Sequence, residues 1–109
     1  MQQETAKKEC PAIIAAFLNK FAADRSRLMI DGYLFKVIAF YEVSINSINV
    51  LPDGLIQFQG NSKISRTDEA SGISQKNVRV QFHGVAFMSE YKNGEEFLYK
   101  VQIDQLKDA

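Results

Sequence analysis

The sequence is poor in the residues on which many enzyme and metal sites depend. Its 109 residues include one cysteine, one histidine and no tryptophan. Because a disulfide needs two cysteines, Cys10 cannot form one within the chain. Because His83 is the only histidine, one chain cannot supply a histidine pair to a metal ion or to a two-histidine mechanism. We therefore expect no metal site, and no residue pattern indicates a cofactor.

The chain also lacks a long apolar segment and an excess of charge of one sign. No stretch approaches the roughly 20 apolar residues that cross a bilayer, so we expect a soluble protein without a membrane span. Lysine plus arginine and aspartate plus glutamate number 13 each, which leaves no net charge. A chain without a basic field does not attract a phosphate backbone, so nucleic acid is not the expected partner.

These features leave the cellular compartment open. A lone cysteine is compatible with a reducing or an oxidising environment. The apolar run at residues 12–18 is short and is followed at once by Asn19 and Lys20, which is not typical of a signal peptide. The opening residues 2–5 equally fit the start of a mature exported chain behind an added Met. The cytoplasm is slightly favoured.

Length and composition predict one globular domain. Hydrophobic residues make up 46% of the chain and charged residues 24%, which are ordinary values for a folded domain. We find no internal repeat, no linker and no low-complexity segment. We therefore expect a single domain over residues 1–109, with residues 1–9 and 105–109 frayed.

An amphipathic pattern predicts one helix near the N-terminus. Pro11 suits the first position of a helix, where a missing N–H costs nothing, and Arg25 suits a C-terminal end. We therefore expect a helix from about Pro11 to Arg25. Its single apolar stripe would cover one face of a sheet, and the stripe is formed by Cys10, Ile13, Ile14, Phe17, Leu18 and Phe21.

The rest of the chain predicts strands joined by short turns. Pro52-Asp53-Gly54 and Asn93-Gly94 predict hairpins, the second through a type I′ turn. Residues 28–30 are ambiguous between a short strand and the connection from the helix, and Asp31-Gly32 marks a turn after them. Four predicted strands are dense in apolar residues with period two, and they cover residues 33–50, 55–64, 78–88 and 97–103.

Two places in these strands predict irregular pairing. In residues 33–50 the apolar residues change phase after Ile45, which an extra residue near Asn46 and Ser47 would produce through a β-bulge. Gly84, within an alternating strand, indicates a bulge or a close approach by another segment.

Together these patterns predict an α+β domain with one N-terminal helix on a curved four-stranded antiparallel meander, in the order α-β-β-β-β. This order of elements resembles the cystatin-like and the small cone-shaped architectures. The resemblance covers the order of elements alone and carries no family motif. It therefore implies a fold and not a function.

The long strand at residues 33–50 suggests a function because both of its alternating sets contain apolar residues. Surplus apolar surface marks a contact with a second copy, with another protein or with a small apolar ligand. We favour a non-enzymatic binding or assembly module that forms a homodimer through a sheet face containing Phe35, Val37, Tyr41 and Val43. A strongly bent sheet that wraps the helix would instead hide both sets.

A second hypothesis is a small-molecule-binding protein or small cone-shaped enzyme with a cavity between helix and sheet. Its polar contacts would be Asp31, Tyr33 and His83, since a carboxylate and a tyrosine in an apolar cavity can support acid–base chemistry. Two of these residues also have a simpler interpretation. Asp31 belongs to Asp-Gly turn chemistry, and the polar neighbours of His83 at period two place it on the solvent side of its strand.

Overall fold

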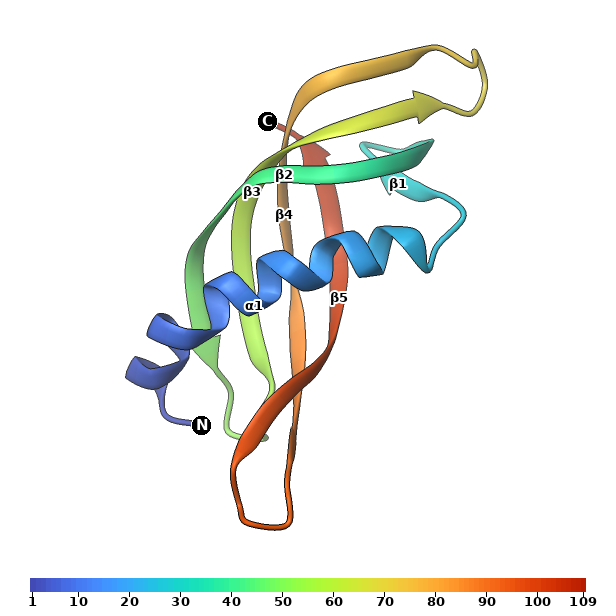
Figure 1. Cartoon of the computed structure of the whole chain (residues 1–109). Coiled ribbons are helices and arrows are strands. Elements are labelled where there is room, and N and C mark those ends of the chain that lie inside the picture. Colours follow the sequence, from blue (N-terminus) through green and yellow to red (C-terminus); the bar gives the residue numbers. More distant parts are fainter.

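The computed structural model describes all of residues 1–109, and it contains one helix and one antiparallel sheet (Figure 1). The strands lie side by side in the order of the chain. The α+β prediction is confirmed, with five strands where the sequence predicted four. The elements are α1 (Gln3–Ala23), β1 (Leu28–Ile30), β2 (Tyr33–Val50), β3 (Ile56–Asp68), β4 (Ser74–Glu90) and β5 (Glu96–Asp108).

The additional strand is β1, which pairs only with the start of β2. Leu28 lies opposite Phe35, and Ile30 lies opposite Tyr33. The turn between them contains Asp31 and Gly32 with φ angles of 50° and 85°. Positive φ at both central residues is the type I′ geometry that Asp-Gly favours in two-residue hairpins. Three residues are too few for a periodic pattern, so this strand is recognised by its pairing and its turn.

Helix α1 begins eight residues earlier than the sequence predicted. Ala6 lies one turn before Cys10 and continues the same buried stripe, which extends through Ile14 and Leu18. Pro11 therefore lies inside the helix, where its missing N–H removes one hydrogen bond to the preceding turn. The structure contains no helix that combines the length and the apolar character needed to cross a membrane.

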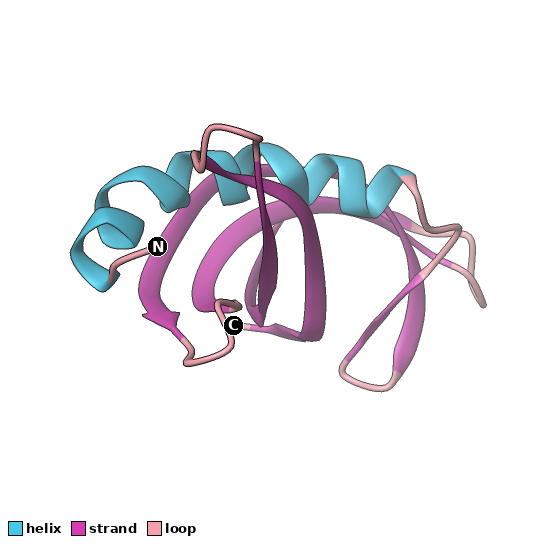
Figure 2. Ribbon diagram, turned by 90° about the horizontal axis from the view of Figure 1, so that it is seen from below, coloured by secondary structure: helices cyan, strands magenta, loops and turns pink.

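The sheet curves around α1 and encloses the core. The backbone of α1 lies nearest to β2 and β5, at the two sides of the sheet. Phe58 and Phe82 fill the space between α1 and the central strands, with their ring centroids 6.0 Å apart. Figure 2 shows the helix lying across the bent strands.

Two phenylalanine–glycine pairs allow β3 and β4 to bend closely over this core. Phe58 lies opposite Gly84, and Gly60 lies opposite Phe82. A Cβ atom at Gly84 would overlap the carbonyl oxygen of Gln102 and meet the ring of Phe58. The register of β4 against β5 shifts at the same glycine, so the predicted bulge at Gly84 is confirmed.

Three bulges in β2 place apolar side chains from both of its alternating sets on the inner face. The register against β3 shifts between Val37 and Ala39, between Tyr41 and Ser44, and between Ile45 and Ser47. The third shift confirms the bulge predicted near Asn46, whereas the first two were not predicted. Because each extra residue reverses the alternation, apolar residues from both sequence sets point toward α1; the buried ones are Phe35, Val37, Phe40 and Ile48.

The hairpins after β2 and β4 share one turn type. In the second, the N–H of Gly94 donates to the carbonyl of Tyr91, and the N–H of Tyr91 donates to the carbonyl of Glu95. Gly94 has a φ of 85°, whereas Asn93 does not have a positive φ. The predicted hairpin is present, but the type I′ assignment is wrong, because a three-residue loop needs positive φ only at its glycine.

Amide side chains of α1 bind the free edge of β2. The N–H of Phe40 donates to Oδ1 of Asn19 at 2.8 Å, and Nδ2 of Asn19 donates to the carbonyl of Phe40 at 3.2 Å. Gln3 makes the corresponding pair of bonds to the carbonyl of Ile48 and the N–H of Val50. Beyond the short β1, the helix thus takes the place of a neighbouring strand at this edge.

The far end of β5 reaches the turn between β1 and β2. The N–H of Asp108 donates to Oδ2 of Asp31 at 2.7 Å. The carboxylate of Asp108 also accepts from Nη1 of Arg66 at 2.7 Å, and the guanidinium of Arg66 lies 4.1 Å from the ring centroid of Phe35. These contacts hold the last residues of the chain in the sheet.

Candidate functional site

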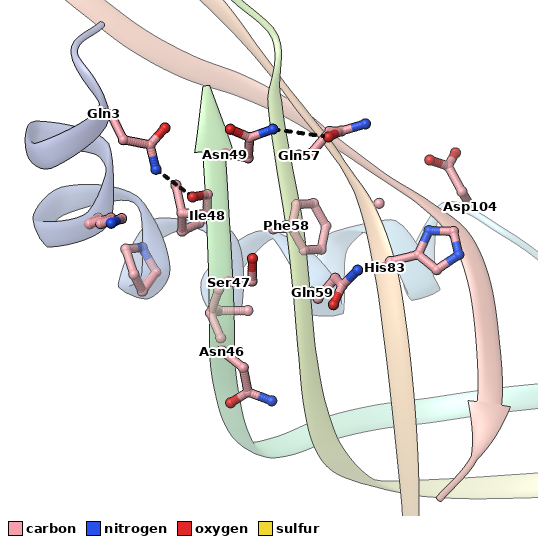
Figure 3. A pocket seen from close by; sticks show the side chains of 14 residues that line it. Gln3, Asn46, Ser47, Ile48, Asn49, Gln57, Phe58, Gln59, His83 and Asp104 are labelled. Atoms are coloured by element: carbon pink, nitrogen blue, oxygen red, sulfur yellow. Dashed lines mark hydrogen bonds between the residues drawn. The ribbon is translucent and has the colours of Figure 1, made fainter. Parts of the chain in front are cut away.

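A hollow of about 850 Å³ opens beside the first turns of α1 and crosses the outer face of the sheet, which is the face turned away from the core. Gln3 and Lys7 of α1 line one end of it. Figure 3 shows polar side chains from β2, β3, β4 and β5 around it; they include Asn46, Asn49, Gln57, Gln59, His83 and Asp104.

The strand register explains why these side chains gather. Gln59 lies opposite His83, and His83 lies opposite Gln105, so the three form one row across β3, β4 and β5. Ser47 continues this row on β2. Because side chains alternate between faces, the neighbours Phe58 and Phe82 point inward to the core. A parallel row contains Asn49, Gln57, Val85 and Gln102.

Neighbouring polar groups in the hollow and beside it form hydrogen bonds with one another. Nε2 of His83 lies 2.9 Å from Oε1 of Gln105, and Nδ2 of Asn49 donates to Oε1 of Gln57 at 3.4 Å. A second hollow of about 300 Å³ adjoins the first and shares Asn46, Gln59 and His83 with it. The two together form a continuous polar surface across four strands.

The four residues predicted for a sheet-face interface do not lie on one free face. Phe35 and Val37 are 7% exposed and belong to the core, so they are not accessible to a partner in this structure. Val43 is half-buried and packs against the same core. Tyr41 lies on the outer face, where its hydroxyl donates to Oδ1 of Asn77 and accepts from the N–H of Asn77, both at 2.7 Å.

The three predicted polar contacts are also separated. Asp31 lines a hollow of about 540 Å³ between β1 and β5, whereas His83 lines the outer-face hollow. Tyr33 lines neither hollow and is exposed at the end of the sheet. The structure therefore does not assemble these residues into one site, although it does place His83 on the solvent side of its strand as predicted.

The titratable side chains offer little for catalysis. Burial raises the pKa of the Cys10 thiol, which disfavours the thiolate needed for a nucleophile. A hydrogen bond from Lys63 lowers the pKa of Glu42, and the two side chains form an ion pair at 2.6 Å on the surface of the sheet. No three histidine, cysteine, aspartate or glutamate side chains gather in a way that could hold a metal ion.

Sequence reasoning did not identify the exposed apolar residues at the end of the molecule where β1 and the β3–β4 turn lie (Figure 1). The sequence contained one sign of these exposed residues, which is that both alternating sets of β2 include apolar residues. It did not show which of them face outward, because the positions of the bulges decide that. We call these residues the hairpin-end patch; they are Met29, Tyr33, Leu34, Ile38 and Ile73, and each is between 46% and 69% exposed.

Comparison with protein-family models, with curated proteins and with solved structures found no match to this chain. Two surfaces of the chain are candidates for a functional contact: the hairpin-end patch and the polar outer face.

Proposed function

We propose that the protein is a non-enzymatic binding or assembly module that forms a homodimer through the hairpin-end patch. The observation that carries this proposal is the exposure of five large apolar side chains at one end of a small domain. Scattered single apolar residues are normal on a surface, whereas a group of them marks a contact surface. This contact replaces the one built on Phe35 and Val37, because those two side chains are buried.

The strand pairing brings part of this patch together. Met29 lies opposite Leu34 in the β1–β2 pair, so both side chains point to the same face. The N–H of Glu69 donates to the carbonyl of Leu34 at 3.3 Å, which holds the β3–β4 turn beside the hairpin. That turn contains Ile73. The patch thus combines side chains from two neighbouring hairpins.

A second copy of the chain is a suitable occupant. Acidic and basic residues are equal in number, so two copies approach without net repulsion. Charged side chains lie near the patch, including the Arg27–Glu69 ion pair at 3.0 Å and the exposed Lys36. An apolar centre with a polar rim is the usual composition of a protein interface.

Sedimentation velocity on the untagged protein tests this proposal. The wild type should sediment as a dimer, and Leu34→Lys combined with Ile38→Lys should release monomers of 12.3 kDa. Ile13→Lys is the matched control, because Ile13 is an exposed apolar residue on α1 outside the patch. A double variant that remains as dimeric as the control would show that the patch is not the contact.

The alternative function, small-molecule binding, is supported by a different observation. The interior between α1 and the sheet is filled by side chains such as Ile14, Leu18 and Phe58, which are at most 1% exposed. The hollow that crosses the outer face is instead open and contains His83. If the protein binds a small molecule, this hollow is the better candidate site, and a mass adduct retained through purification would support it.

A further inference from the structure

We propose that the outer face of the sheet binds a neutral, hydroxyl-rich ligand of the oligosaccharide class. This inference rests on the alternative function above, small-molecule binding, and names its ligand. It starts from the two rows of side chains that cross β2 to β5. The rows are built from the amides Asn49, Gln57, Gln59, Gln102 and Gln105, together with Ser47, His83 and Val85.

Neither row contains a charged residue, which bears on the charge of the ligand. Charged residues make up 24% of the chain, yet none occupies either row. Charged residues do occur elsewhere on the same outer face, at Lys63 and Arg79, so the two uncharged rows are a distinct part of it. A phosphate or sulfate ligand needs arginine or lysine partners. The hollow itself is lined by one basic and one acidic residue, Lys7 and Asp104, which leave it without net charge, so a neutral ligand suits it better than an anionic one.

The amide side chains of the rows are suited to bind hydroxyl groups. A carboxamide offers a donor and an acceptor in one plane, and a hydroxyl group also donates and accepts, so neighbouring amides match neighbouring hydroxyls. Peptide recognition by a sheet instead uses a strand edge and pockets for apolar side chains. The rows run across the middle of the sheet and expose little apolar surface, which favours a sugar over a peptide.

Several side chains of the rows are already held in place in the free protein. Asn49 is hydrogen-bonded to Gln57, and His83 is hydrogen-bonded to Gln105, so part of each row is ordered before a ligand binds. Beneath them, the phenylalanine–glycine pairs fix the bend of β3 and β4. Side chains that are already ordered lose less entropy on binding. The hollow of about 850 Å³ is in the size range of ligand sites.

The affinity should be low, because the rows contain no exposed aromatic ring on which a sugar could stack. A dissociation constant on the order of 1 mM is expected for a short oligosaccharide. Binding that is useful at this affinity requires repeated sites, which the proposed dimer would supply.

Titration of ¹⁵N-labelled full-length protein with cellohexaose, chitohexaose and maltohexaose tests the inference, because NMR resolves side-chain amide groups directly. At least one of the three sugars should shift the side-chain resonances of Gln59 and Gln105. Gln59→Leu combined with Gln105→Leu should weaken binding at least about tenfold. Gln2→Leu, an exposed amide on the N-terminal side of α1, is the matched control and should bind normally.

Three outcomes would overturn the inference: no shift on the outer face with about 10 mM of any of the three sugars, a double variant that binds as tightly as the control, or shifts produced only by a polyanion or a peptide. The last result would retain a binding site but change the ligand class. Sedimentation of the same samples reports the dimer independently, so a failure here is distinguishable from a failure of the assembly proposal.

Discussion

The replacement of Asn19 by alanine should destabilise the protein by separating α1 from the edge of β2. The Asn19 amide satisfies both the N–H and the carbonyl of Phe40, a residue that is 3% exposed. The nearest strand at this edge, β1, ends its pairing at Phe35. In the variant, these two backbone groups must find water or remain unpaired.

The magnitude follows from two opposing effects. Each lost hydrogen bond costs about 1 kcal/mol net, so the pair contributes about 2 kcal/mol. Alanine is a better helix former than asparagine by roughly 0.5 kcal/mol, which offsets part of the loss. We therefore expect the free energy of unfolding to fall by about 1.5 kcal/mol, which corresponds to a lower melting temperature by roughly 6–12 °C for a domain of this size.

Urea denaturation and hydrogen exchange measure this effect separately. The denaturation midpoint should fall without a change in m-value, and the backbone amide of Phe40 should exchange faster than in the wild type. Lys8→Ala is the matched control, because Lys8 is exposed on the same helix. An Asn19→Ala protein with an unchanged midpoint and unchanged exchange at Phe40 would refute the reasoning.

Two further substitutions probe local geometry and charge. Gly84→Ala should lower the free energy of unfolding by about 3 kcal/mol or more, because the added Cβ would meet the backbone carbonyl of Gln102. Gly94→Ala should lower it by about 1 kcal/mol, because the space around Gly94 is open and only its positive φ opposes a side chain. Equal losses of stability in urea denaturation would contradict this reasoning. Lys63 lowers the pKa of Glu42 in the folded protein. The ionised Glu42 therefore stabilises the fold fully at pH values above the pKa of an unfolded glutamate, and this contribution is lost as the pH falls through the lower pKa of the folded state. Lys63→Met should return that pKa to its usual range in an NMR titration, and an unchanged value would exclude Lys63 as the cause.

Local patterns predicted the helix and most of the strands correctly. Cys10, Ile14 and Leu18 form the buried stripe of α1, as their spacing indicated. The start of α1 was missed because a proline most often begins a helix, and Pro11 instead lies within one. Tertiary packing of Ala6 against the core outweighed that local preference.

The faces of β2 could be predicted only in part, because a bulge reverses every side chain beyond it. The phase change after Ile45 indicated the third bulge, whereas the first two lie among residues that are apolar in both alternating sets and leave no phase change to detect. This is why Phe35 and Val37 were predicted at an interface but lie in the core. The outer polar rows were not predicted, because they depend on register across four strands and no single strand reveals them.

Native mass spectrometry of the untagged wild-type protein is the most direct test of the central claim, that the chain assembles through its hairpin-end patch. We expect a species of twice 12.3 kDa with no additional mass, and we expect the variant that carries both Leu34→Lys and Ile38→Lys to appear at the single-chain mass. A wild-type protein that remains a monomer throughout the micromolar range would contradict the proposed assembly.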